Sequence, residues 1–252
     1  MKYLKAEALK FKNSFSMYVL FLSPLVFLCF SIFTAVFAKS NSLTPNGLSP
    51  YITLLFNLWP IAFIPIVVCL ACYSLIMIET RNKMFNFYLS NNWDLTKEIK
   101  AKIFIISFAF LIHGLMMYIV ALVGDFLISP SPIKPSLLLA TILIIFWVAI
   151  PLIPLNFLLL RYLGIFLTIF VNLVLSIFSI IFLTLKSVFW LSPWAIMQKI
   201  PLITLGILPN GLTVDKYSKY FNDLESLYIS IIVSIVTYII FTILNTKKSW
   251  RL

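Results

Sequence analysis

Long apolar stretches separated by short charged segments make up most of this chain. The uncharged runs cover residues 13–38, 40–78, 103–124, 135–160, 162–185 and 226–246. A helix needs about 20 apolar residues to cross the hydrocarbon core of a membrane, and each run is long enough. The pattern predicts an all-α integral membrane protein, a single domain over residues 1–252. Its six spans are expected near 16–38, 53–78, 103–128, 136–160, 162–185 and 227–246.

The composition supports this class. Of the 252 residues, 62% are hydrophobic and only 11% are charged, whereas a soluble domain is about 45–50% apolar and about 25% charged. A soluble globule of this size could not cover so much apolar surface. Soluble enzymes, disordered chains and collagen-like chains are therefore excluded.

The basic residues predict the orientation of the spans. The net charge is +11, which in a soluble protein would suggest nucleic acid, but in a membrane protein it reports topology. With six spans both termini share a side, and that side carries 13 of the 19 basic residues. The positive-inside rule places both termini in the cytoplasm.

The first segment, residues 1–15, has helical periodicity. Leu4, Ala8 and Phe11 lie on one stripe, and four lysines lie off it: Lys2, Lys5, Lys10 and Lys12. This pattern predicts an amphipathic helix on the cytoplasmic membrane surface. An ordinary basic flank of the first span would give the same composition.

The loop over residues 79–102 is the densest charge cluster in the chain. It has charged ends and an aromatic centre, which suits a short helix resting on a cytoplasmic partner. Asp94 is expected to cap a helix that begins near Leu95 and continues into the third span. A solvated connector with aromatic side chains at the membrane interface is the alternative.

The external segment over residues 186–226 is too long for a turn and too apolar for a solvated loop. Neither of its apolar pieces reaches spanning length, so we expect short helices that enter the outer leaflet and return, a re-entrant hairpin. Its acidic residues could attract a cationic peptide, or they could be ordinary solvated loop charges. These residues are Asp215, Asp223 and Glu225.

Catalytic motifs are missing from the sequence. It has no Walker A pattern, no H-E-x-x-H and no G-x-S-x-G. His113 lies in the third span, where we expect a neutral side chain hydrogen-bonded to a neighbouring helix. Cys69 and Cys72 are expected to be packing residues. Prolines at 60, 65, 151 and 154 predict kinks or local unwinding in spans two and four.

The order of these features resembles the ABC-2-type transporter permeases. The start Met1-Lys-Tyr-Leu-Lys-Ala-Glu-Ala-Leu-Lys-Phe-Lys12 resembles that family's surface helix. The stretch from Glu79 to Lys102 resembles its coupling segment, although Leu89 is followed by Ser90 where the family commonly has Leu-Pro. The segment Trp194–Gly211 is similar to a run in the permeases of lantibiotic-immunity transporters.

The resemblance implies a permease subunit that exports a lantibiotic or bacteriocin peptide from the producer's membrane. Two copies of a separate ABC ATPase would bind ATP and Mg²⁺, so this chain would be no enzyme and hold no cofactor. A second permease, commonly a different homologous chain, would complete the transporter in the bacterial cytoplasmic membrane. No nucleic acid is expected as a partner.

The same resemblance implies two sets of site residues. The expected ATPase-coupling residues are Glu79, Arg81, Leu89, Trp93, Asp94 and Lys97. The expected external re-entrant motif comprises Trp194, Pro201, Gly206, Pro209, Asn210 and Gly211.

Three alternatives stay open. The chain could be an ABC-2 permease for another toxic peptide, an antibiotic or a lipid-linked molecule. It could be a secondary transporter, which would need coupling carboxylates or a repeat between its halves. It could also be a membrane scaffold without transport activity.

Overall fold

The computed structural model describes residues 2–12, 14–37, 44, 47–128, 131–215 and 217–247. The expected basic end of the chain, residues 248–252, lies outside this part. The described residues are helical apart from turns, loops and one isolated antiparallel bridge between Ile207 and Thr213.

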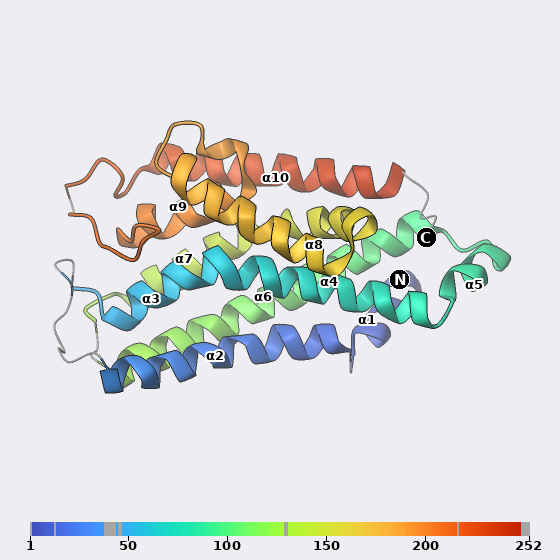
Figure 1. Cartoon of the computed structure of the whole chain (residues 1–252), viewed down its shortest axis with the longest axis horizontal. Coiled ribbons are helices and arrows are strands. Elements are labelled where there is room, and N and C mark those ends of the chain that lie inside the picture. The colour runs from blue at the N-terminus through green and yellow to red at the C-terminus, as the bar shows by residue number, and fades with distance from the viewer. Residues whose placement is uncertain are drawn as a thin grey trace.

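Long helices lie side by side along one axis, with short helices at the ends of the bundle and one packed within it (Figure 1). In chain order the elements are α1 (Lys2–Phe11), α2 (Phe15–Phe37), α3 (Pro50–Leu58), the π-helix η1 (Trp59–Phe63), α4 (Ile64–Arg81), α5 (Met84–Ser90), α6 (Leu95–Ile128), α7 (Pro135–Ala149), α8 (Leu152–Phe182), the 3₁₀-helix η2 (Phe189–Leu191), α9 (Pro193–Leu205) and α10 (Leu224–Lys247).

Five of the described helical segments are long and apolar enough to cross a membrane. They are Phe15–Thr34, Pro50–Arg81, Leu95–Leu127, Pro135–Phe182 and Leu224–Thr246. The first three and the last lie where the sequence predicted spans. One segment of 48 residues, Pro135–Phe182, covers the predicted fourth span and all but the last three residues of the predicted fifth.

This 48-residue segment folds back on itself at Gly164. Gly164 has φ 69° and ψ 179°, a conformation outside the helical region that L side chains rarely adopt. The Asn172 amide nitrogen donates to the Asn156 side-chain oxygen at 2.7 Å. Sixteen residues would span about 24 Å in a straight helix. The two halves of α8 therefore form a hairpin.

Two of the four predicted prolines coincide with interruptions, whereas Pro65 and Pro154 lie within the first turns of α4 and α8. Pro60 lies within η1, where the α-helical pattern between α3 and α4 gives way to a π-helix. Pro151 lies between α7 and α8. Because proline lacks a backbone donor and its ring crowds the preceding turn, it favours such local changes.

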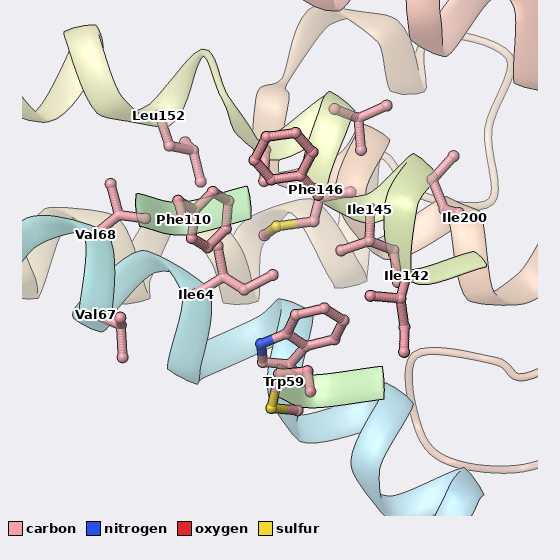
Figure 2. Packing of buried hydrophobic residues seen from close by; sticks show 14 of the residues in the cluster. Trp59, Ile64, Val67, Val68, Phe110, Ile142, Ile145, Phe146, Leu152 and Ile200 are labelled. Carbon is pink, nitrogen blue, oxygen red and sulfur yellow. The ribbon is translucent and has the colours of Figure 1, made fainter. Parts of the chain in front are cut away.

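The core lies between α4, α6, α7 and α9 (Figure 2). Trp59, Phe110 and Ile145 are almost fully buried there and belong to one continuous apolar cluster. Large apolar side chains on the outer faces of α2, α8 and α10 are exposed instead. This pattern, buried packing inside and exposed apolar side chains outside, is the one that a lipid environment allows.

One close contact fixes α3 against α6. A Cβ atom added to Gly124 would lie 2.3 Å from the Tyr51 ring, whereas one added to Gly114 of the same helix would lie 3.8 Å from its nearest neighbours. Gly124→Ala should therefore destabilise the protein by about 1–3 kcal/mol through overpacking. Gly114→Ala should be neutral or stabilising because alanine favours a helix interior. Thermal unfolding in detergent measures both, and equal melting temperatures for the two variants would contradict this packing.

Candidate functional site

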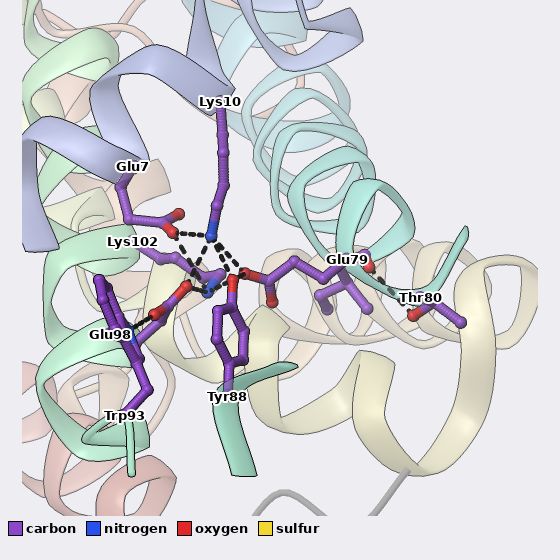
Figure 3. A network of polar contacts seen from close by, with 9 residues as sticks. Glu7, Lys10, Glu79, Thr80, Tyr88, Trp93, Glu98 and Lys102 are labelled. Atoms are coloured by element: carbon purple, nitrogen blue, oxygen red, sulfur yellow. Dashed lines mark hydrogen bonds and ion pairs between the residues drawn. The ribbon is translucent and has the colours of Figure 1, made fainter. Parts of the chain in front are cut away.

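Four helices meet at one end of the bundle around a group of charged side chains (Figures 1 and 3). We call this group the charged cluster. It consists of Glu7 and Lys10 on α1, Glu79 on α4, and Glu98 and Lys102 on α6. Tyr88 on α5 completes it. Helices α4, α5 and α6 follow one another in the chain, whereas α1 lies more than 50 residues before them, so the cluster joins α1 to the other three.

Helical periodicity places two charged residues of α1 on its inward face, whereas Lys2 and Lys5 are exposed. Glu7 and Lys10 are three residues apart and both point toward the bundle (Figure 3). Of the predicted apolar stripe, Leu4 and Ala8 are exposed, and only Phe11 packs against the core. The helix thus exists, but its inward face carries two charged residues beside Phe11. Lys10 is correspondingly inside the protein, where a membrane-surface position was expected.

The Lys10 ammonium lies at the centre of the cluster. Its Nζ atom donates to the Glu79 and Glu98 carboxylates at 2.7 and 2.6 Å, and it also pairs with Glu7. The Lys102 ammonium lies 2.7 Å from Glu79, 3.1 Å from Glu98 and 3.5 Å from Glu7. Two ammonium groups thus share three carboxylates, one from each of three helices.

Aromatic side chains close the cluster. The Tyr88 hydroxyl accepts from Lys10 at 2.6 Å and donates to Glu79 at 2.8 Å. The Trp93 indole donates to Glu98, and its ring contacts Tyr3 with centroids 4.8 Å apart. These contacts tie the 79–102 loop to the first turn of α1 and keep water away from the ion pairs.

Burial sets the charge state of this site. The three carboxylates outnumber the two ammonium groups, which gives a formal charge of −1 when all five groups are ionised. Glu7 is fully buried, and its second oxygen has no hydrogen-bond partner. Burial raises the pKa of Glu7 to about 7, against the attraction of Lys102 and Lys10. A proton on Glu7 neutralises the whole cluster.

Lys10 remains charged. Burial acts to lower the pKa of Lys10, but the carboxylates of Glu79 and Glu7 outweigh it and raise the pKa above its usual value.

The three carboxylates do not form a metal site. Their ligand atoms lie within 4.8 Å of one another, as in a cation site. The Lys10 and Lys102 ammonium groups already occupy the space between these oxygens. A divalent ion would have to displace both positive charges. The arrangement is suited to joining helices rather than to binding a metal.

The structure separates the predicted coupling residues into two groups. Glu79 is buried in the charged cluster, and Trp93 packs against Tyr3 and Glu98. Asp94 caps α6, as predicted, by accepting from the backbone of Thr96 and Lys97 at 3.0 and 3.2 Å. Hydrogen bonds from Thr96 and Lys97 lower the Asp94 pKa to about 2.

Other coupling residues face outward. Arg81 and Lys97 are exposed. Phe87 on α5, which was not among the predicted coupling residues, is exposed as well. The side chain of Leu89 lies outside the described residues.

Sequence reasoning missed Glu7, Tyr88 and the central role of Lys10. One signal was present: Glu7 is the only acidic residue among the first 78. A single carboxylate within a lysine-rich segment can form ion pairs inside the protein, whereas a membrane-surface helix has no need of it. Its partners are distant in sequence, so the pairing itself was invisible.

The predicted external motif is divided between a buried helix and a turn. Trp194 and Pro201 belong to α9, whose residues are all buried. Gly206 ends this helix in the left-handed conformation, with φ 70°. Pro209, Asn210 and Gly211 form a turn in which the Asn210 side chain accepts from the Leu212 backbone at 3.1 Å.

Side-chain hydrogen bonds hold α9 against the α8 hairpin. The Trp194 indole donates to Asn172 at 3.3 Å, and the Gln198 amide donates to the Ser176 hydroxyl at 2.8 Å.

The predicted peptide-contact residues differ in their availability. Asp223 accepts from the Ser226 backbone and hydroxyl at 3.1 and 2.6 Å, so it caps α10. Burial opposes ionisation of Asp223, but the bonds from Ser226 lower its pKa overall. Asp215 and Glu225 are exposed. The three do not form a cluster comparable to the one around Lys10.

The two side-chain groups noted within the spans have structural partners. His113 Nδ1 lies 2.8 Å from the Leu20 carbonyl, and the Trp59 indole donates to Nε2 at 3.3 Å. This is a neutral imidazole bonded to neighbouring helices, as predicted. Cys69 and Cys72 are free thiols buried in α4, which agrees with a packing role.

The raised pKa of Glu7 predicts a pH-dependent stability. The folded state holds this proton more tightly than the unfolded chain, so the contribution of Glu7 to stability is fully present below about pH 4.5 and is lost as the pH rises through about 7. The melting temperature of the purified protein should therefore decrease between pH 5 and pH 8. Glu7→Gln should flatten this decrease because it removes the titrating group. Glu225→Gln, at an exposed carboxyl, should keep it, and an unchanged slope in Glu7→Gln would contradict the assignment.

Comparison with known proteins does not assign the chain to a family. No family model matches the chain, and no curated protein or solved structure matches it. Conclusions about function rest on the residues themselves.

Proposed function

We propose that this chain is the membrane-spanning permease subunit of an ATP-driven ABC exporter in a bacterial cytoplasmic membrane. The α8 hairpin supports an arrangement in which Pro135–Phe182 crosses twice, which makes six crossings and returns both termini to the cytoplasmic side. The charged cluster then lies at the cytoplasmic end, where the positive-inside rule predicts residues 79–102.

The observation that carries the proposal is the joining of four helices by the charged cluster. Two ammonium groups from α1 and α6 pair with carboxylates from α1, α4 and α6. Breaking a buried ion pair by removing one partner costs about 3–5 kcal/mol. A unit held in this way moves as one body when a partner pushes on it. This is the mechanical property that coupling to a separate ATPase requires.

The exposed side of the unit provides a docking surface. Phe87 on α5 is 52% exposed, and Arg81 and Lys97 flank it in sequence with exposed cationic side chains. An exposed aromatic residue with charges around it is a typical anchor for a protein partner. Closure of an ATPase dimer would press on this surface, and α4 and α6 would carry the displacement into the membrane.

The substrate proposal rests on the similarity of Trp194–Gly211 to lantibiotic-immunity permeases. In this proposal the transporter takes a cationic lantibiotic or bacteriocin peptide from the membrane and releases it outside. A second permease chain pairs with this one, and ATP and Mg²⁺ bind to the two ATPase subunits. Exposed Asp215 and Glu225 are available to attract the peptide.

A different ABC-2 substrate, such as an antibiotic or a lipid-linked molecule, is compatible with the same coupling unit. A secondary transporter is less well supported, because it gives no role to an exposed docking surface. A membrane scaffold would use such a surface too, and recovery of an ATPase subunit distinguishes the two.

Co-purification tests the proposal. The tagged chain, isolated from its own cells in mild detergent, should bring down an ATPase subunit. Arg81→Glu/Lys97→Glu and, separately, Phe87→Ser should reduce recovery of that subunit at least tenfold, because they change the exposed docking side chains. Quantitative mass spectrometry measures the recovery.

Lys134→Glu is the matched control, since it reverses an exposed charge in the loop before α7. It should leave recovery unchanged, and all variants should keep the wild-type melting temperature. If no nucleotide-hydrolysing protein accompanies the wild-type chain, the proposed function is wrong.

A further inference from the structure

A cavity of about 300 Å³ lies where α8 ends and α10 begins, away from the charged cluster. Three lysines line it from three different segments: Lys186 after α8, Lys199 on α9 and Lys219 before α10. Asp223 and Glu225 also line it. Three ammonium groups against two carboxylates give the cavity a formal charge of +1. The proposed function uses one residue of its rim, Glu225, and assigns no role to the three lysines.

Lys199 is the unusual member of this group. Its residue is only 4% exposed, yet within the described part of the chain its ammonium makes no hydrogen bond or ion pair. The Nζ atom lies 3.7 Å from the centroid of the buried Phe189 ring. A cation–π contact of this kind satisfies the charge only in part. The Lys199 side chain is thus almost wholly enclosed, and its ammonium opens only onto the cavity, where an acceptor can reach its three donors.

The carboxylates in the cavity do not supply that acceptor. Both carboxylate oxygens of Asp223 accept hydrogen bonds from Ser226, one from its backbone and one from its hydroxyl. Glu225 is exposed. Burial lowers the pKa of Lys199, and the nearby Asp223 offsets this only partly. An anion entering the cavity would supply the acceptors that these carboxylates do not.

The rim of the cavity indicates where the anion comes from. Large apolar side chains next to it are exposed, among them Leu185, Val188 and Trp190. Tryptophan and aliphatic side chains of this kind lie at the membrane interface, with the headgroups beside them. Basic pockets between membrane helices bind lipid headgroups by the same combination of charge and apolar contact.

We propose that this cavity is a binding site for a singly charged phosphate group, with Lys199 as its buried anchor and Lys186 and Lys219 as its outer contacts. The phosphodiester of an anionic phospholipid fits both the formal charge and the apolar rim. Free inorganic phosphate would be recognised by the same lysines, and the experiment below distinguishes it from the phospholipid.

Native mass spectrometry tests the site on the purified full-length chain. Phosphatidylglycerol is titrated into protein in detergent, with phosphatidylcholine as the zwitterionic comparison. The wild type should bind phosphatidylglycerol preferentially, and Lys199→Gln should weaken this binding about tenfold, as expected for the loss of a charge-assisted contact. Lys199→Arg should retain it. Lys134→Gln removes a lysine outside the cavity and should leave it unchanged.

Two further arms complete the test. Inorganic phosphate is added without lipid, and if it occupies the site and displaces phosphatidylglycerol competitively, free phosphate is the occupant. If Lys199→Gln does not yield folded protein, Lys186→Gln/Lys219→Gln removes two exposed contacts and should weaken phosphatidylglycerol binding in the same direction. Equal phosphatidylglycerol binding by the wild type and the folded lysine variants would overturn the proposal.

Discussion

The ion pairs around the Lys10 ammonium are the interaction on which the arrangement of this end of the molecule depends. Hydrophobic burial gives little direction inside a membrane, because lipid chains are as apolar as the side chains that they replace. Buried charges are different, because a buried charge without a partner destabilises the protein by several kcal/mol. By pairing across α1, α4 and α6, Lys10 and Lys102 specify how these helices sit at their common end.

A second set of polar contacts performs the same task within the bundle. Asn172 bonds Asn156 across the α8 hairpin and accepts from Trp194 on α9, while Gln198 bonds Ser176. A short helix that does not span a membrane needs such partners, because its ends leave backbone groups unsatisfied. Charged groups thus organise one end of the protein, and neutral amides and hydroxyls hold α9 against α8.

The apolar pattern predicted most helix positions because membrane thickness dictates span length. The local chemistry of single residues predicted the Asp94 cap and the interruptions at Pro60 and Pro151. The apolar pattern did not predict the inward face of α1, since periodicity identifies two faces and does not say what covers each. The charged cluster could not be predicted from the sequence either, because Lys10 lies 69 residues from Glu79 and 88 from Glu98. No local rule connects side chains at that separation.

Hydrogen–deuterium exchange in Lys10→Met and Lys12→Met tests the central claim, that the cluster makes four helices one unit. Both variants remove one lysine at the C-terminal end of α1, but Lys12 is exposed. Lys10→Met should increase backbone exchange in α5 and at the start of α6, far from the substituted residue in sequence, as well as in α1. Lys12→Met should change none of these segments. Faster exchange confined to α1 in Lys10→Met would show that the helices are not coupled through the cluster.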